Sequence, residues 1–152
     1  MMQEWYSENV SSDWTAQRAR IMGLLQDEAE LDEMVKLVGI DALVAQERLK
    51  LEIARSIRED YLHQDAFHEV DTYASLNKQC TMSKLILKFY DMAKSALDDG
   101  ININKIVDMP VRERIGRIKY VSEDKVIAEY ELIIEQITSQ IQKLKEEAAQ
   151  DA

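Results

Sequence analysis

The chain has 152 residues, of which 46% are apolar and 32% charged, and its four glycines and one proline disfavour an all-β fold with many tight turns. Its net charge of −10 disfavours binding to nucleic-acid phosphates or to an anionic membrane surface. The first residues lack the apolar core of a secretory signal, and no apolar run approaches the roughly 18 residues of a membrane helix, so we expect an intracellular protein.

The first long helix is predicted over residues 12–38, after a flexible lead at residues 1–11. Ser12 is a good N-cap, and Gly39 is the residue type expected just past a helix end. Asp27 falls inside the apolar stripe of this helix, which indicates either a bend near Gly23 or a face that is only partly buried. The stripe consists of Leu24, Leu31, Val35 and Val38.

The second helix is predicted over residues 45–62 and has an apolar and a charged face. The apolar face carries Leu49, Ile53, Ile57 and Tyr61. The opposite face carries Arg48, Glu52, Arg55 and Glu59, at spacings that allow pairing within the helix. We interpret the charged face as solvent-exposed, because pairs of this kind on a surface contribute little to stability.

The rest of the chain also predicts helices. A long helix is expected over residues 76–99, ending before Gly100, with Cys80 beside its apolar stripe as a core residue. Short helical turns follow near 104–107 and after Pro110, because proline suits the first turn of a helix. The last helix opens at Ser122, and its apolar stripe consists of Val126, Tyr130, Ile133, Ile137, Leu144 and Ala148. The predicted fold is an all-α bundle of about four long helices with short helical turns, forming one domain over residues 12–152.

The motifs of common catalytic sites are absent from the sequence. It has no phosphate loop of the form G-x-x-x-x-G-K-[ST], and one cysteine with two histidines cannot supply a zinc-ligand set. The best metal candidate is His63 and His68 among nearby carboxylates, but these histidines are five residues apart in a segment that is not predicted to be helical. We therefore expect no catalytic residue and no metal site in this chain.

Two clusters of like charge lie in separate parts of the chain. Residues 26–34 are an acidic run, QDEAELDEM, and residues 105–119 contain a basic island. The island consists of Lys105, Arg112, Arg114, Arg117 and Lys119. Either cluster could face a partner of opposite charge, but a solvated helix face for the first and internal pairing for the second are the favoured interpretations.

Two further stretches raise the question of a binding surface. The turn GIDALVAQERL, residues 39–49, is apolar at its tip, where Leu43 and Val44 either pack on this chain or press on another protein. The segment AFHEVDTY, residues 66–73, places Phe67, Val70 and Tyr73 three apart between two long helices. Such aromatics either wall a pocket for a flat ligand or fill the gap between helix ends, and spacing alone favours the second role.

Three separated motifs resemble one known family. LLQDEAELDEMVKLVGIDAL, ARSIREDYLHQDAFHEVDTYAS and PVRERIGRIKY together resemble the C-terminal helical domain of the catalytic A subunit, or alpha chain, of archaeal- and vacuolar-type rotary ATPases. In that family the phosphate loop, the catalytic carboxylate and the magnesium ligand lie in an earlier domain. The resemblance therefore implies that this chain is part of a larger ion-translocating ATP synthase or ATPase that binds ATP or ADP with magnesium.

The resemblance implies a contact with the central rotor for the apolar turn. In the related F-type subunit the equivalent turn carries an acidic D-E-L-S-E-E-D loop that leans on the rotating shaft. The matching positions here are Asp41, Ala42, Leu43, Val44 and Ala45. They keep the Asp-x-Leu start without most of the later acids, so we expect steric contact through Leu43 and Val44 to matter more than charge.

The resemblance also implies a role in nucleotide binding for the aromatic segment. Family members complete the adenine pocket with an aromatic from F-H-x-V-D-T-Y, which corresponds to Tyr73 here, with Phe67 and Ala74 as neighbouring candidates. The family often has Pro where this chain has Glu69 and Asn where it has Asp65. The implied partners are the nucleotide-binding domain of the same polypeptide, the B subunit and the rotor subunit of the central stalk, on the cytoplasmic face of the membrane.

One alternative belongs to a different functional class. The chain could be a self-contained acidic helical adaptor whose last helix docks on a partner helix through its apolar stripe. Such a stripe should cause self-association that depends on concentration, whereas a stripe that belongs to the core of the bundle should not. A small metal-dependent enzyme built on His63 and His68 is the weakest of the three hypotheses.

Overall fold

The computed structural model describes the backbone of residues 2–61 and 75–151 and the side chains of residues 14–59 and 77–151. The described backbone is helical with no strand, so the predicted all-α fold is confirmed. The long helices are α1 (Met2–Val38), α2 (Ala45–Ser56), α3 (Ser75–Asp98) and α6 (Val126–Asp151). The short helices are α4 (Ile103–Val107) and α5 (Val111–Arg117). Single turns complete the described elements: η1 (Ile40–Ala42), the π-helical η2 (Ile57–Tyr61), η5 (Ile118–Tyr120) and η6 (Glu123–Lys125).

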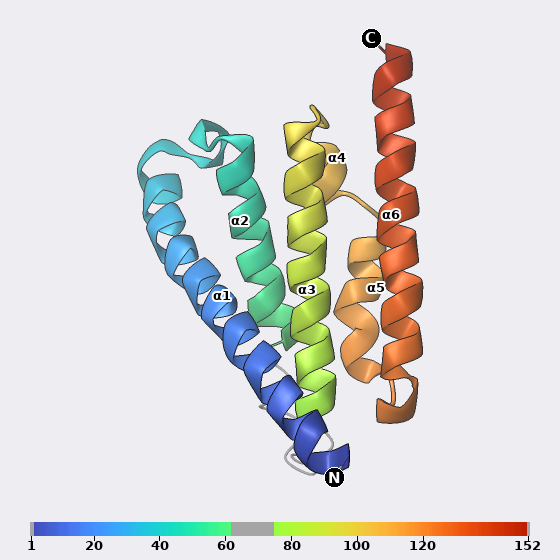
Figure 1. Ribbon diagram of the computed structural model, residues 1–152. Coiled ribbons are helices and arrows are strands. Elements are labelled where there is room, and N and C mark those ends of the chain that lie inside the picture. Colours follow the sequence, from blue (N-terminus) through green and yellow to red (C-terminus); the bar gives the residue numbers. More distant parts are fainter. Residues whose placement is uncertain (1, 62–74, 152) are drawn as a thin grey trace.

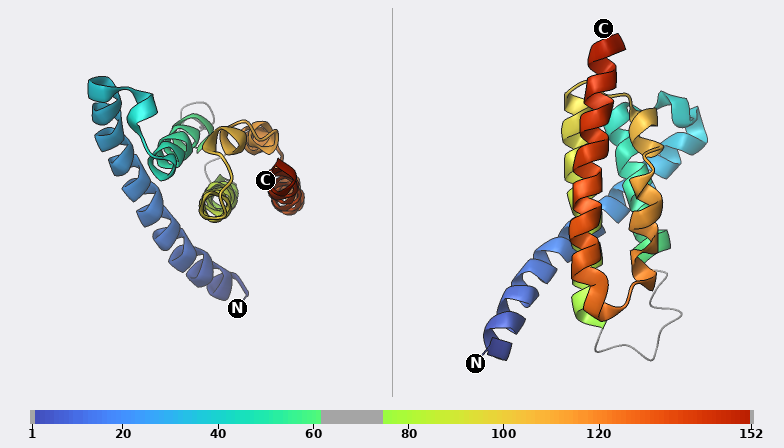
Figure 2. Two further views of the ribbon diagram at one scale, coloured as in Figure 1. Left: turned by 90° about the horizontal axis from the view of Figure 1, so that it is seen from above. Right: turned by 90° about the vertical axis from the view of Figure 1, so that its right-hand side faces the viewer.

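The helices form two layers with α1 lying obliquely along one side (Figure 2). One layer contains α3 and α6, and the other contains α2, α4 and α5. α1 and α2 form an antiparallel hairpin that η1 closes at one end of the molecule (Figure 1). The start of α3 lies toward the opposite end of the molecule from η1 (Figure 1).

Most helix boundaries agree with the local sequence, but α2 ends at Ser56, where η2 begins, and α6 begins at Val126 after η6 rather than at Ser122. The start of the chain differs as well. α1 begins at Met2, ahead of the predicted N-cap at Ser12, because no glycine or proline interrupts the helix before Gly23. It continues through Gly23 as one helix, and Asp27 sits in its stripe because Lys50 of α2 binds the carboxylate, with an Nζ–Oδ2 distance of 3.3 Å. The stripe is therefore partly polar rather than interrupted.

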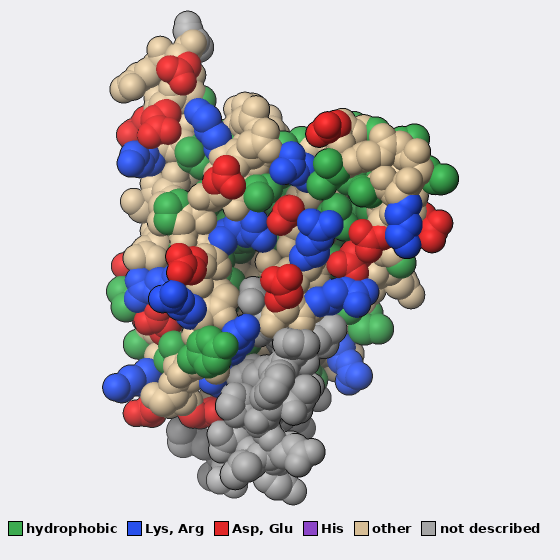
Figure 3. Space-filling view, turned by 180° about the vertical axis from the view of Figure 1, so that it is seen from behind, with side chains coloured by type: hydrophobic (Ala, Val, Ile, Leu, Met, Phe, Trp, Pro, Cys, Tyr) green, Lys and Arg blue, Asp and Glu red, His purple; other side chains and the backbone are tan. Residues whose placement is uncertain are grey.

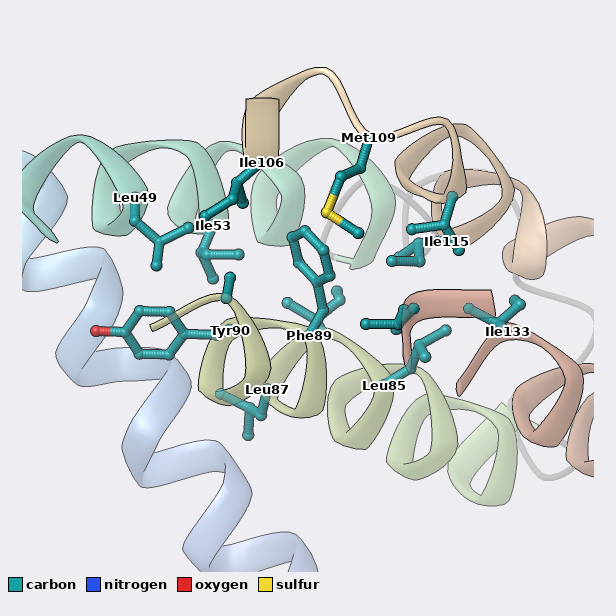
Figure 4. Packing of buried hydrophobic residues seen from close by; sticks show 14 of the residues in the cluster. Leu49, Ile53, Leu85, Leu87, Phe89, Tyr90, Ile106, Met109, Ile115 and Ile133 are labelled. Carbon is teal, nitrogen blue, oxygen red and sulfur yellow. The ribbon is translucent and has the colours of Figure 1, made fainter. Parts of the chain in front are cut away.

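The main core lies between the two layers. Phe89 of α3 points toward Met109 and Ile106 across this core, and all three side chains are buried (Figure 4). Tyr90 is buried where α3 meets α1, and this burial raises the pKa of its hydroxyl above the ordinary value. Cys80, predicted as a core residue, is only half-buried, and its thiol donates to Gln17 Oε1 over 3.6 Å.

The last helix contributes directly to this core. Of the predicted stripe, Val126, Ile133 and Ile137 are fully buried, and Tyr130 and Leu144 are partly buried against the same core. Ala148 was wrongly included because it is exposed, and the prediction missed Ile141, which is 6% exposed. α6 therefore covers α3 with this face. In the described part of α6, the only large apolar side chains that are exposed are those of Ile127 and Leu132. The surface that an adaptor would need is therefore largely occupied by the core of the domain. Within residues 2–61 and 75–151, no helix is both long and apolar enough to traverse a bilayer.

Candidate functional site

The candidate site is the closed end of the α1–α2 hairpin. α1 ends at Val38, and Gly39 adopts a φ of 88°, a left-handed conformation that other residues rarely adopt. The Gly39 N–H donates to the Val35 carbonyl at 2.9 Å, which closes the end of the helix. At the start of α2 the Val44 N–H donates to Glu47 Oε1 at 3.2 Å. The sequence thus fixes a short, well-defined turn between two packed helices.

Leu43 faces inward from this turn. It is 9% exposed and packs in a small cluster with Leu31 of α1 and Leu51 of α2, and the half-buried Val35 and Ile40 pack against the same cluster. The expectation that Leu43 and Val44 together form an exposed apolar tip is therefore wrong for Leu43. Its side chain closes the hairpin.

The exposed apolar surface lies beside the turn instead. Leu37 is 82% exposed, Val38 is 62% exposed and Val44 is 61% exposed, and Met34 lies on the same end of α1. We call Leu37, Val38 and Val44 the apolar tip. Val38 was predicted to lie in the buried stripe of the first helix, but the core ends one turn earlier. Asp41 and Ala42 are also exposed, whereas Ala45 is half-buried.

The opposite end of α2 is held by polar contacts. Glu28 of α1 is 3% exposed, and its Oε1 accepts a hydrogen bond from Arg58 Nε in η2 at 2.5 Å. Lys119, which lies in η5, donates a hydrogen bond from Nζ to the Glu59 carbonyl over 3.3 Å. These contacts fix the last described turn before residue 62. Among the described residues no group of histidine, cysteine and carboxylate side chains could hold a metal ion.

The predicted nucleotide residues cannot be placed. Phe67, Tyr73 and Ala74 lie outside the described residues, and so do His63 and His68 of the metal alternative. Their roles therefore stay predictions.

The basic island pairs largely within the protein, whereas the acidic run is paired in part and exposes Glu30 and Glu33 on the predicted solvated face. In the acidic run, Asp27 binds Lys50 and Glu28 binds Arg58. In the basic island, ion pairs join Arg112 to Glu52, Arg114 to Glu129 and Arg117 to Glu113. The bond to Glu129 also raises the pKa of Arg114 above its ordinary value. Internal pairing of the basic island is thus confirmed for its three arginines.

The interpretation of the charged face of α2 was wrong for two of its residues. Arg48 Nη1 donates to Asn104 Oδ1 at 2.8 Å, and Glu52 Oε2 accepts from Arg112 Nη1 at 3.3 Å. At these two positions α4 and α5 cover the face, whereas Arg55 and Glu59 are exposed as predicted. Periodicity located the face correctly but could not show which distant segment packs on it.

Comparison with known proteins decides between the alternatives. Residues 3–107 match the family of the C-terminal domain of V and A type ATP synthase. The chain belongs to this family. The family resemblance is thereby confirmed, and the match includes the first two motifs and continues through the whole hairpin to the end of α4.

Individual proteins of known sequence are also similar to this V/A-type domain, and some of them match nearly its whole length. The V-type ATP synthase alpha chain of Acetivibrio thermocellus is 55% identical over 141 residues, which cover 93% of this chain and 24% of that protein. The alpha chain of Clostridium botulinum strain Langeland is 60% identical over 122 residues, or 80% of this chain and 21% of the relative. That of Clostridium perfringens strain SM101 is 51% identical over 143 residues, or 94% and 24%. This chain spans about a quarter of the length of the curated relatives it matches.

Proposed function

We propose that this domain contacts the central rotor of a rotary ATPase through its apolar tip and completes the adenine pocket of the catalytic subunit. The observation that carries the proposal is the exposed tip of Leu37, Val38 and Val44 on a packed helical hairpin. These three apolar side chains are exposed at the same end of the hairpin, and apolar surface gathered in one place can mark a protein contact. In a V/A-type alpha chain, the partner that this end of the domain would meet is the rotor.

The hairpin has the mechanical properties that such a contact needs. α1 and α2 pack along their length, and the cluster around Leu43 closes their common end. The tip lies at the closed end of the hairpin, whereas the start of α3, which follows the proposed nucleotide residues in the sequence, lies toward the opposite end of the domain. A movement of this domain that follows nucleotide binding would thus be delivered to the rotor at the far end.

Removing the apolar tip should weaken the rotor contact. In the assembled ATPase, the triple variant Leu37→Gln, Val38→Gln and Val44→Ser should lower affinity for the rotor subunit about tenfold or more, because full burial of one such side chain contributes about 1.5–3 kcal/mol and about 1.4 kcal/mol is tenfold. Affinity and torque are the measurements. The variant Ile127→Gln with Leu132→Gln is the matched control, because it removes exposed apolar side chains of α6. Undiminished rotor affinity and torque in the triple variant would exclude the contact.

The second part of the proposal concerns the nucleotide. We infer from the family resemblance that Tyr73 stacks on the adenine, with Phe67 and Ala74 beside it, while the catalytic residues and the ligands of magnesium lie elsewhere in the parent subunit. The chain itself then has no catalytic residue. ATP or ADP would bind where this domain meets the nucleotide-binding domain of the same polypeptide.

Tyr73→Ala in the full-length subunit should weaken ATP binding by about 1–3 kcal/mol, the scale of aromatic stacking on a base. The measurement is the ATP dissociation constant. Tyr120→Ala is the matched control, because Tyr120 is 74% exposed on η5 and far along the chain. An ATP dissociation constant equal to that of the wild type would remove Tyr73 from the pocket.

The parent assembly supplies the remaining parts of the proposal. The domain would work with the B subunit and the central-stalk rotor in the head of the enzyme, peripheral to the membrane on its cytoplasmic face. Nucleotide turnover there would be coupled to ion transport through rotation.

A further inference from the structure

A row of polar side chains joins α2 to the layer of α4 and α5. On α2 the row uses positions 48, 52 and 56, which are four apart and therefore lie on one side of the helix. Arg48 binds Asn104 of α4, while Arg112 of α5 binds both Glu52 and Ser56. We call these five residues the polar seam. Figure 3 shows basic and acidic side chains alternating across the face of the molecule on which these helices lie.

Arg112 is the centre of the polar seam. Its Nη1 donates to Glu52 Oε2 at 3.3 Å and to the Val107 carbonyl at 2.9 Å, and its Nη2 donates to Ser56 Oγ at 3.2 Å. One guanidinium thus connects α5 to the C-terminal end of α4 and to two successive turns of α2. The planar, forked donor set of arginine suits this arrangement, whereas the single ammonium of lysine does not.

The polar seam fixes the position of α2 relative to α4 and α5 and adds little to the stability of the domain. The side chains of Arg112 and Glu52 are 22% and 16% exposed, and a partly buried ion pair costs nearly as much to desolvate as it gains. The apolar contacts beneath it, such as those of Ile53 and Ile115, are non-directional and would allow α2 to shift along α5. Hydrogen bonds are directional, so the bonds from Arg112 to Glu52 and Ser56 favour one position of α2 relative to α5, and the bond to the Val107 carbonyl holds the guanidinium against α4.

We propose that Arg112 is a positioning residue that locks α2 to α4 and α5, so that displacement of one end of α2 reaches the apolar tip undiminished. The inference rests on the proposed function of the tip. α2 connects η2 to the turn at the tip, and π-helical turns such as η2 are frequent at functional sites. Without the lock, sliding of α2 would absorb the displacement before it reached the rotor.

The first test measures the lock itself. Hydrogen exchange of the α2 amides is compared among the wild-type chain, Arg112→Gln and Arg117→Gln. Arg117 lies on the same helix and pairs with Glu113, but its side chain is 72% exposed, so Arg117→Gln is the matched control. Arg112→Gln should accelerate exchange in α2 about tenfold relative to α3, the scale set by losing one charged hydrogen bond. Arg112→Lys should restore part of the protection, and the control should show none of the acceleration.

The second test measures coupling in the assembled ATPase that carries the same substitutions in its full-length alpha chain. The number of ions transported per ATP hydrolysed should fall in Arg112→Gln and stay at the wild-type value in Arg117→Gln, while ATP affinity stays unchanged in both. Should Arg112→Gln fail to fold, Glu52→Gln breaks the same pair from the other side and should give the same result.

Three outcomes would overturn the lock. In the first, the α2 amides of Arg112→Gln exchange hydrogen at the wild-type rate. In the second, Arg117→Gln loses as much coupling of ion transport to ATP hydrolysis as Arg112→Gln does. In the third, Arg112→Gln keeps wild-type coupling although the apolar-tip triple variant loses it. This outcome would overturn the lock and leave the proposed rotor contact intact. Wild-type coupling in both of these variants would instead overturn the proposed rotor contact, and the lock with it.

Discussion

A chain that ends at Val107, where the match to the V/A-type family ends, should lose cooperative unfolding altogether. The truncation removes α5 and α6 and exposes the side of α3 that α6 covers. Each of the four buried α6 side chains contributes about 1.5–3 kcal/mol, so together they contribute about 6–12 kcal/mol. The whole stability of a domain is about 5–15 kcal/mol, so little would remain.

The truncation is tested by urea unfolding followed by circular dichroism. A chain ending at Lys145 is the control, because it keeps every buried residue of α6 and the ion pair of Lys145 with Asp99. The control should unfold in one transition close to that of the whole chain. A cooperative transition of similar midpoint in the chain that ends at Val107 would show that α1 to α4 form an independent core.

The helices could be predicted from local signals, because each signal acts within a few residues. Gly39 ends α1 through its left-handed conformation, and Pro110 immediately precedes α5 at Val111. The apolar spacing of α6 correctly identified Ile133 and Ile137 as core residues. These predictions required no knowledge of the arrangement of the helices.

The candidate site was harder to predict because it depends on what covers each helix face. Glu52 lies on a charged face that could equally have met water, and only the position of Arg112, sixty residues later, makes that face internal. Val38 continues an apolar stripe beyond the end of the core, so its exposure could not be read from spacing. Tyr73 became a candidate only through the family resemblance.

Leu43→Ala should destabilise the domain by about 2–3 kcal/mol, although it lies in the turn that the resemblance assigns to the rotor. Burial of Leu43 against Leu31 and Leu51 is the reason, since removing a buried leucine leaves a cavity and costs about 2–5 kcal/mol. The lower half of that range applies because the cluster is small and lies near the surface. Val44→Ala, at a side chain that is 61% exposed, should change stability by no more than about 0.5 kcal/mol.

The two substitutions separate folding from function within one turn. The free energy of unfolding in urea should fall for Leu43→Ala alone, whereas rotor affinity should fall for Val44→Ala without any loss of stability. Replacing residues 42–45 together by glycine would combine both effects, and a loss of torque could then reflect a collapsed hairpin. Equal stability of the two variants would mean that Leu43 does not close the hairpin, and its side chain would then return to the list of residues that can contact the rotor.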